Sequence, residues 1–453
     1  MKMLSNLTIK DVAAVLDATL EKFDENASFT SVSTDTRKIE NNGLFVALKG
    51  PNFDGHVYLD VAKANGAVAA VVEDSSEVSL TQIKVPSTLS ALGIMAAARR
   101  RAFPGKVIGL TGSNGKTTVK EMIAHLLERK GNVLSTDGNF NNDIGLPLTI
   151  MRLKNNESFA VIEMGANHPG EIDYLSHITQ PDIALITNAG AAHLEGFGSL
   201  EGVAEAKGEI FDHLAENGTA VVNLDDNFSG RWLARTTKFK TKTFSIENEN
   251  ADVYAKNISI KQNVSEFDLC IRSSGEIHVC LPLSGKHNVA NAMVSSLVAD
   301  ECGLALGEIK VGLESFNMVN GRLTFKTGIN GSVVIDDTYN ANLDSSKAAI
   351  DVLSEQVGET YFIFGDLFES GDNAIAIHQE VGKYAKEKDV RHFYAVGDLT
   401  KHSVENFGQG ARHFPDKKTL SEFLSNQVNK ESTILVKGSR GMKMEQIVSE
   451  VVV

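Results

Sequence analysis

The segment of the chain with the clearest chemical potential is TGSNGKTT at residues 111–118, which lies between an apolar run and a segment of helical periodicity. Its glycines allow the backbone to curl so that several N–H groups point at one anion, and the helix that follows adds partial positive charge. Lys116 can then reach the outer phosphates of a nucleotide, and the Thr117 hydroxyl can ligate Mg²⁺. The alternative is a glycine turn that only joins a strand to a helix. The flanking elements favour the phosphate site.

The spacing of the glycines narrows the kind of phosphate site. The common nucleotide-binding loop has a further glycine five residues before the glycine of its Gly-Lys pair. That position is Leu110 in this chain, and the first glycine is Gly112, so the loop reads GxxGKTT. This shorter loop is typical of Mur ligases and folylpolyglutamate synthases, and not of GTPases, kinases or transporter ATPases.

Further polar residues follow apolar runs that we expect to be strands of the same sheet. Glu163 ends the run VIEMG, and His193 comes shortly after IALITNAG. At the carboxyl ends of neighbouring strands, a carboxylate and an imidazole can converge on a cation beside the phosphates. Two other readings stay open at this point: His193 as a surface or packing residue, and Lys207, in AEAKGEI, as a solvated lysine.

The elements that must position these residues form three units, which we place at 1–84, 85–318 and 319–453. The first is a small α/β unit, and residues 87–103 read as an alanine-rich helix. From Lys106 onward, apolar runs alternate with helices, which indicates a parallel sheet covered on both faces. Residues 251–281 alternate with period two, as in antiparallel strands. The pattern of strands and helices then restarts near Asn320 and ends with ILVKG.

Composition excludes several classes of protein. A net charge of −14 argues against a nucleic-acid-binding face, which would be basic. No apolar run approaches the roughly 20 residues that a membrane span needs, and the N-terminus lacks a signal-peptide core. Cys270 and Cys280 could face each other, but we interpret them and Cys302 as reduced core thiols. We therefore expect a cytoplasmic protein that neither binds nucleic acid nor inserts into a membrane.

Several longer motifs resemble those of the Mur ligase family, and the match runs nearly from end to end. They are TDTR at 34–37, GLFVALKG, FDGH at 53–56, GLTGSNGKTTVKEM, GNFNNDIGLPLT, IEMGANHPGEI, GKHNVANA, GR at 321–322, DDTYNAN and KGSR. Val57, Tyr58 and Ser370 depart from the family pattern. The resemblance implies an α/β fold of three domains: a small N-terminal domain, a central P-loop ATPase-type parallel sheet and a C-terminal Rossmann-like domain.

The resemblance also implies roles for individual residues. It implies ATP binding by Gly112, Ser113, Asn114, Gly115, Lys116, Thr117, Thr118, Asn288, Arg322 and Asp337. It implies that the UDP-sugar-peptide substrate is held by Thr34, Asp35, Arg37, Asp54, His56, Asn141 and Asn142, although turn chemistry alone could explain the last two. It implies that Mg²⁺ is held by Thr117, Glu163, His193 and, if carbamylated, Lys207. The implied catalytic residues are Lys116, Lys207 and His193.

The activity that follows from the resemblance is ATP-dependent amide ligation in peptidoglycan precursor synthesis. ATP would phosphorylate the terminal carboxylate of UDP-N-acetylmuramoyl-tripeptide, and the amine of D-alanyl-D-alanine would attack the acyl phosphate. The third domain would close over ATP and bind the dipeptide, in a protein that we expect to be a monomer. The alternatives are another ligase of the superfamily, a P-loop switch or motor protein, and a binding protein without activity.

Overall fold

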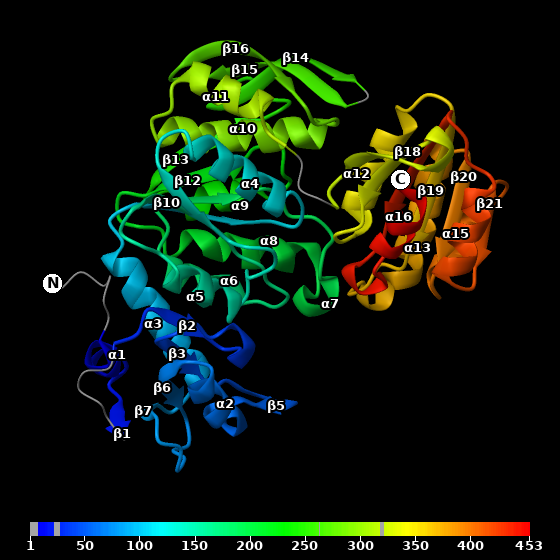
Figure 1. Cartoon of the computed structure of the whole chain (residues 1–453). Coiled ribbons are helices and arrows are strands. Elements are labelled where there is room, and N and C mark those ends of the chain that lie inside the picture. The colour runs from blue at the N-terminus through cyan, green and yellow to red at the C-terminus, as the bar shows by residue number, and fades with distance from the viewer. Residues whose placement is uncertain (1–7, 22–27, 262, 318–320) are drawn as a thin grey trace.

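The computed structural model describes residues 8–21, 28–261, 263–317 and 321–453, and shows three α/β domains in chain order (Figure 1). The predicted boundary between residues 318 and 319 falls outside these ranges. The main sheets of the three domains have five, nine and six strands, and the N-terminal domain holds a further two-stranded sheet. The central domain lies between the other two, so both of its neighbours can contribute to a site built on the central sheet.

The N-terminal domain has the strand order β1-β7-β6-β3-β2, in which only β1 runs antiparallel to its neighbour. Helix α3 joins this domain to the next one, because Leu92 and Met95 pack into the N-terminal core while Ala96 and Ala97 pack into the central core. The elements are α1 (Ile9–Leu16), β1 (Thr19–Glu21), β2 (Ser31–Ser33), β3 (Gly43–Val46), β4 (Lys49–Gly50), β5 (Phe53–Asp54), α2 (Leu59–Ala64), β6 (Ala67–Val72), β7 (Thr81–Lys84) and α3 (Thr88–Ala102).

The central domain has a nine-stranded sheet in the order β16-β15-β14-β13-β12-β11-β8-β10-β9. Strands β8 to β14 are parallel, and β14, β15 and β16 form the antiparallel part that the period-two pattern predicts. The strands are β8 (Lys106–Thr111), β9 (Asn132–Ser135), β10 (Glu157–Glu163), β11 (Ile183–Ile186), β12 (Thr219–Asn223), β13 (Lys240–Ser245), β14 (Val253–Lys261), β15 (Val264–Ile271) and β16 (Gly275–Leu281).

Helices cover both faces of the central sheet, as its continuous apolar strands require. Alternate residues of β8 serve the two cores: Ile108 and Leu110 pack with α4, α10 and α11, and Val107 packs with α5, α6, α8 and α9. The helices are α4 (Lys116–Leu127), α5 (Gly145–Met151), α6 (Glu171–Thr179), α7 (Leu194–Phe197), α8 (Leu200–Gly208), the 3₁₀ turn η4 (Glu209–Phe211), α9 (Ser229–Arg235), α10 (Lys286–Glu301) and α11 (Leu306–Glu314).

The C-terminal domain has the strand order β17-β18-β22-β19-β20-β21, with only β17 antiparallel. Helices α12, α13 and α14 cover one face, and α15 and α16 cover the other. The elements are β17 (Thr324–Thr327), β18 (Val333–Asp337), α12 (Leu343–Ser354), β19 (Glu359–Gly365), α13 (Ala374–Glu387), β20 (His392–Val396), α14 (Thr400–Phe407), β21 (Ala411–Phe414), α15 (Lys417–Ser425), β22 (Ser432–Lys437) and α16 (Glu445–Val451).

The interpretation of three core thiols is wrong for Cys280. All three cysteines are free, but Cys280 is exposed while Cys270 and Cys302 are buried. The strand register places Cys270 opposite Glu276 and Cys280 opposite Glu266, so the two cysteines do not face each other. The reason is the alternation along β16, in which Val279 and Leu281 face the core and Cys280 therefore points to the open face.

Candidate functional site

The predicted phosphate-binding loop lies between β8 and α4, as the sequence predicts, and its backbone path requires two glycines. Gly112 has φ +152° and Gly115, at the start of α4, has φ +80°. A Cβ on Gly112 would lie 1.9 Å from Thr187 Oγ1, and one on Gly115 would lie 2.7 Å from Asn291 Oδ1. Any larger residue would therefore clash with the surrounding side chains at both positions.

The end of strand β11 fixes the middle of this loop. The Asn188 side chain bridges both backbone groups of Asn114: its Oδ1 accepts from the Asn114 N–H at 2.9 Å, and its Nδ2 donates to the Asn114 carbonyl at 3.1 Å. The Thr187 hydroxyl donates to the same carbonyl at 2.6 Å. Asn188 was not among the residues predicted for the site. The signal for it was present, because it is a polar residue at the carboxyl end of an apolar strand.

Lys116 lies over its own loop, half-buried, and its Nζ donates to the Gly112 carbonyl at 2.6 Å. Burial lowers the pKa of this ammonium group and the charge of Arg322 acts in the same direction, while Glu163 opposes both. An anion beside Nζ would raise the pKa of Lys116 again, because an opposite charge favours the protonated amine. The surroundings of Lys116 therefore suit a phosphate ligand.

The predicted magnesium ligands Thr117 and Glu163 are in direct contact. Thr117 Oγ1 donates to Glu163 Oε2 at 3.2 Å, and Asn141 Nδ2 donates to the other carboxylate oxygen at 2.9 Å. Arg322 Nη2, from the start of the C-terminal domain, donates to Thr117 Oγ1 at 3.0 Å. Hydroxyl and carboxylate oxygens fit Mg²⁺, which usually completes its shell with phosphate oxygens and water. No group of three or more His, Cys, Asp or Glu side chains in the parts of the chain described above could hold a metal alone.

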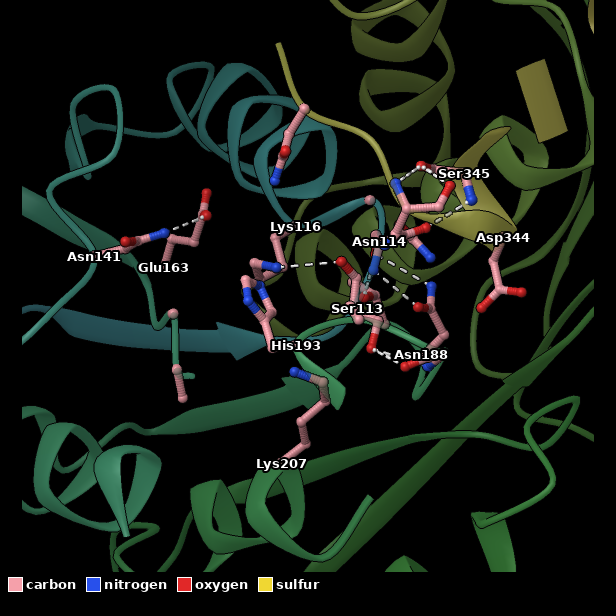
Figure 2. A pocket seen from close by; sticks show the side chains of 18 of the residues that line it. Ser113, Asn114, Lys116, Asn141, Glu163, Asn188, His193, Lys207, Asp344 and Ser345 are labelled. Carbon is pink, nitrogen blue, oxygen red and sulfur yellow. Dashed lines mark hydrogen bonds between the residues drawn. The ribbon is translucent and has the colours of Figure 1, made fainter. Parts of the chain in front are cut away.

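His193 and Lys207 face the same space as Lys116 (Figure 2). His193 begins α7 with a left-handed backbone, φ 55°, and its imidazole pairs with Glu369 of the C-terminal domain. Lys207 is 2% exposed, so the alternative of a solvated lysine is excluded. Burial lowers the pKa of its amine well below the usual value, and the charge of Lys116 adds to that effect.

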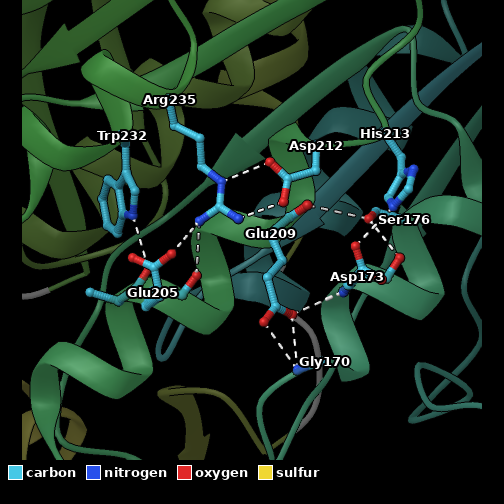
Figure 3. Close-up of polar contacts among 10 residues, drawn as sticks. Gly170, Asp173, Ser176, Glu205, Glu209, Asp212, His213, Trp232 and Arg235 are labelled. Atoms are coloured by element: carbon cyan, nitrogen blue, oxygen red, sulfur yellow. Dashed lines mark hydrogen bonds and ion pairs between the residues drawn. The ribbon is translucent and has the colours of Figure 1, made fainter.

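The segment that carries Lys207 is anchored on both sides of that residue (Figure 3). Before it, Trp232 Nε1 donates to the Ala204 carbonyl at 3.0 Å, and Arg235 pairs with Glu205 at 2.7 Å. After it, Glu209 accepts from the Asp173 N–H at the start of α6, at 3.0 Å. These contacts fix the helix so that the buried lysine points into the cleft.

The C-terminal domain brings one further predicted nucleotide residue, Asp337, to the cleft together with Arg322. Asp337 is buried, and its carboxylate accepts from Lys437 Nζ at 2.5 Å and from the Leu323 N–H at 3.2 Å. Asn288, from α10, is also buried, and its Nδ2 donates to the Ser284 carbonyl at 2.8 Å. All line one cleft of about 1460 Å³ with the phosphate loop.

The predicted substrate residues of the N-terminal domain lie elsewhere. Arg37 pairs with Asp35 at 2.8 Å and holds the pKa of that carboxyl at about 2. The His56 ring is engaged on both sides, by Asp54 at 2.6 Å and by the Glu73 N–H at 2.8 Å. Within the described ranges, none of these residues lines the cleft, and neither does Thr34, whereas Asn141 and Asn142 both do.

Comparison with known proteins identifies the family. Residues 110–299 match the Mur ligase middle domain, residues 321–440 the Mur ligase glutamate ligase domain, and residues 28–100 the Mur ligase family catalytic domain. UDP-N-acetylmuramoyl-tripeptide–D-alanyl-D-alanine ligase of Escherichia coli K12 is 42% identical, with 98% of each chain covered.

The chain belongs to the Mur ligase family.

Solved structures agree with this assignment. MurF from Acinetobacter baumannii matches this Mur ligase with a TM-score of 0.93 and 35% identity over 98% of each chain. MurF from Thermotoga maritima, in complex with ADP, matches with a TM-score of 0.83 and 28% identity over 93% of this chain and 96% of its own. The predicted three-domain fold, the class of ATP-dependent, ADP-forming ligase, and the use of ATP with Mg²⁺ are confirmed. In the described parts of the chain, no helix is both long and apolar enough to cross a membrane.

Proposed function

We propose that this Mur ligase joins D-alanyl-D-alanine to UDP-N-acetylmuramoyl-tripeptide while ATP is converted to ADP and phosphate. The relatives named UDP-N-acetylmuramoyl-tripeptide–D-alanyl-D-alanine ligase from Escherichia coli and Bacillus subtilis are 42% and 36% identical to this chain, and each is covered over 98% of its length. The observation that carries the proposal is the cleft that Lys116, Glu163, Lys207 and Arg322 all line, with Thr117 hydrogen-bonded to both Glu163 and Arg322.

Amide formation from a free carboxylate is uphill in water, so the acid must first be activated. A carboxylate oxygen of the tripeptide attacks the terminal phosphorus of ATP, and ADP leaves. The dipeptide amine then attacks the carbonyl carbon of the acyl phosphate, loses a proton, and phosphate departs. Lys116 and Arg322 offset the repulsion between the carboxylate and the triphosphate. Mg²⁺ held by Thr117 and Glu163 would supply further neutralisation of phosphate charge.

Lys207 is proposed to carry a carbamate in the working enzyme. A buried amine whose pKa lies well below its usual value loses its proton readily, and the neutral nitrogen can attack carbon dioxide. A nitrogen–carbon bond forms as one carbon–oxygen double bond of carbon dioxide opens, and the nitrogen releases a proton. The resulting carbamate anion, together with His193, would hold a second Mg²⁺. Isotope-labelled bicarbonate should give a carbamate NMR signal that disappears in Lys207→Met. If the wild-type enzyme is active without that signal, the modification has no role.

The remaining predicted residues are proposed to contact the UDP-linked substrate and the nucleoside part of ATP. Thr34, Asp35, Arg37, Asp54 and His56 would hold the UDP end of the substrate, with Asn141 and Asn142 at its sugar-peptide part. Exposed Arg37 supports this, since a guanidinium matches phosphate geometry. Asn288 would contact adenine and Asp337 the ribose of ATP. We place the domains at 1–84, 85–318 and 319–453, with the third binding the dipeptide.

We also infer that the enzyme works as a monomer in the cytoplasm. The three free cysteines support a reducing compartment. Both nucleotide substrates would be at hand there. Lys116, Glu163, Lys207 and Arg322 line one cleft within a single chain, which supports a monomeric active unit. Light scattering of the purified protein measures the mass of that unit.

The proposal is tested by the mass of the product. Protein, Mg²⁺-ATP, UDP-N-acetylmuramoyl-tripeptide and D-alanyl-D-alanine are mixed, and the UDP-linked product should gain one dipeptide less one water. ATP turnover should require the dipeptide, and diaminopimelate, lysine or glutamate should not replace it. Turnover with one of those amino acids would identify another ligase of the superfamily, and turnover without either peptide substrate would indicate a switch or motor protein.

A further inference from the structure

A cysteine, a histidine and an aspartate lie in line on the open face of β15 and β16, at the edge of the central sheet. Cys280 Sγ is 3.7 Å from His278 Nε2, and His278 Nδ1 is 2.8 Å from Asp268 Oδ1. Asn257 Nδ2 donates to the other Asp268 oxygen at 2.7 Å. The group belongs to no part of the cleft, since no residue of β14, β15 or β16 lines it within the described ranges.

The contacts of the two ring nitrogens indicate where the imidazole proton lies. Hydrogen bonds from Asn257 and His278 lower the pKa of Asp268, so its carboxylate is ionised and accepts the Nδ1 proton. In the neutral ring with its proton on Nδ1, Nε2 is the acceptor nitrogen, and it lies 3.7 Å from the thiol sulfur. An imidazole oriented by a carboxylate and directed at a thiol is the arrangement that removes a thiol proton.

The other two cysteines lack such an arrangement. Burial raises the pKa of Cys302 to about 11, and burial together with Glu276 raises that of Cys270 to about 11. The Cys270 thiol donates to Glu276 Oε2 at 3.3 Å, which holds its proton in place. Only a thiolate is a nucleophile, so these two thiols serve as internal references for an unreactive cysteine.

The charges around Cys280 come in compensated pairs. Glu266 lies opposite Cys280 in the strand register and pairs with Lys261 at 2.5 Å. On the other side, Glu314 of α11 accepts from the Cys280 N–H at 3.0 Å and pairs with Lys310 at 3.4 Å. No unpaired carboxylate among these neighbours opposes a negative charge on the sulfur.

Lys256 adds a positive charge next to Asp268. It lies opposite Asp268 in the register of β14 and β15, and its Nζ is 3.7 Å from Glu276. The titratable groups on this face around His278 include Asp268 and Cys280, which contact the ring, and Glu266, Cys270, Glu276 and Lys256 on the same three strands.

We propose that Cys280 is a modification site for small disulfides, with His278 as the base that takes its proton and Asp268 as the residue that orients the ring. Cys280 sulfur attacks one sulfur of a disulfide such as oxidised glutathione. A new sulfur–sulfur bond forms, the old one breaks, and the second glutathione leaves as a thiolate that takes up the proton from His278. The exchange is balanced without a further oxidant.

The test uses the full-length enzyme and oxidised glutathione at about pH 7, where an unassisted thiol is mostly protonated. Intact mass followed over time should show one glutathionyl group on wild type and none on Cys280→Ser. His278→Gln should react at least about tenfold more slowly than wild type, because general-base assistance is worth at least that much. His402→Gln is the matched control, since it removes another half-exposed histidine paired to a carboxylate; its rate should equal that of wild type.

The pH profile separates base assistance from simple exposure. The wild-type rate should fall less steeply than that of His278→Gln as the pH is lowered from about 8 to 7, because the thiol–imidazole proton transfer does not need hydroxide. Ligase activity should be the same in wild type and Cys280→Ser. Equal rates and parallel profiles for wild type and His278→Gln, or equal labelling of Cys270 and Cys302, would overturn the proposal.

Discussion

Two lysines in the cleft have amines in different settings. Lys116 donates to a carbonyl of its own loop, and nearby Glu163 favours its protonated form. A bound anion would favour the protonated form further. Lys207 is more deeply buried and its charge is opposed by that of Lys116. The first is suited to stay protonated against phosphate, and the second to lose its proton and react.

Replacing Lys116 tests the first of these roles. Lys116→Ala should lower kcat/KM by at least about 10²–10³-fold, the typical loss for one transition-state charge partner. Its far-ultraviolet circular dichroism should match that of wild type, since the glycines and Asn188 hold the loop. Lys154→Ala, which removes an exposed lysine, is the control and should keep wild-type activity. A folded Lys116→Ala enzyme with near-normal product formation would refute the phosphate-cradle role.

The pH dependence of stability tests the second role. Because the folded pKa of Lys207 is lowered, the unfolded chain binds this proton more readily between that pKa and the unfolded value of about 10.4. The free energy of unfolding should therefore rise with pH across this window, in bicarbonate-free buffer. Lys207→Met should be more stable near neutral pH and lose this part of the slope. Denaturant unfolding measures it, with Lys154→Met as reference, and a variant with an unchanged slope would contradict the assignment.

At the scale of elements, the contacts in Figure 3 connect α6, α8, η4 and α9 into one support for Lys207. Glu209 is central to it: its carboxylate accepts from the Gly170 N–H at 3.0 Å and from the Asp173 N–H at 3.0 Å. These N–H groups belong to the first turn of α6 and have no partners within the helix. One side chain thus caps α6 and holds the end of α8.

Glu209→Ala should lower the free energy of unfolding by about 1–2 kcal/mol, the usual cost of losing a helix cap. It should also lower kcat, because Lys207 is only two residues away on the same turn. Glu216→Ala, an exposed glutamate after the same segment, is the matched control. Urea unfolding and ligase assays on both variants measure the effects. Equal stability of the two variants would show that the cap contributes nothing.

The sequence predicts elements and local motifs well, because their signals are local. The strand–turn–helix around residues 112–118, the antiparallel strands at 251–281 and the strand-end position of Glu163 all follow from neighbouring residues. His193 lies beyond the end of β11, at the start of α7. The burial of Lys207 does not follow from neighbouring residues, because it depends on tertiary packing around α8, where the Lys207 amine lies over the Phe197 ring of α7 and Trp232 of α9 donates to the Ala204 carbonyl. The exposure of Cys280 does not either, because it depends on which face of β16 the residue occupies. The Arg322–Thr117 contact joins positions 205 residues apart, and no local pattern encodes it.

At the scale of the whole molecule, the C-terminal domain is closed onto the phosphate loop. Arg322 reaches Thr117, Asn342 Nδ2 donates to Asn114 Oδ1 at 2.9 Å, and Asp344 Oδ2 accepts from the Ala191 N–H at 3.0 Å. The Glu369–His193 pair adds a fourth contact. Polar contacts of this kind suit a domain interface that opens and closes, because water can replace each contact when the domains separate.

Asp344→Ala should shift the molecule toward an open arrangement. The lost hydrogen bond is worth about 1 kcal/mol, so the KM for ATP should rise about fivefold. Small-angle X-ray scattering should show a larger radius of gyration than for wild type in the absence of nucleotide. Asp398→Ala, which removes an exposed carboxylate of the same domain, is the control. An unchanged KM and an unchanged radius in Asp344→Ala would show that this contact does not hold the domains together.

The fate of the carboxylate oxygen tests the central claim, which is that the cleft uses ATP to turn an acid into an acyl phosphate. UDP-N-acetylmuramoyl-tripeptide is labelled with heavy oxygen in its terminal carboxylate, and the released phosphate is examined by mass spectrometry after one turnover with D-alanyl-D-alanine. Activation by phosphoryl transfer predicts one heavy oxygen in each phosphate and the other in the new amide. Phosphate free of the label, with product formed at the normal rate, would contradict the mechanism.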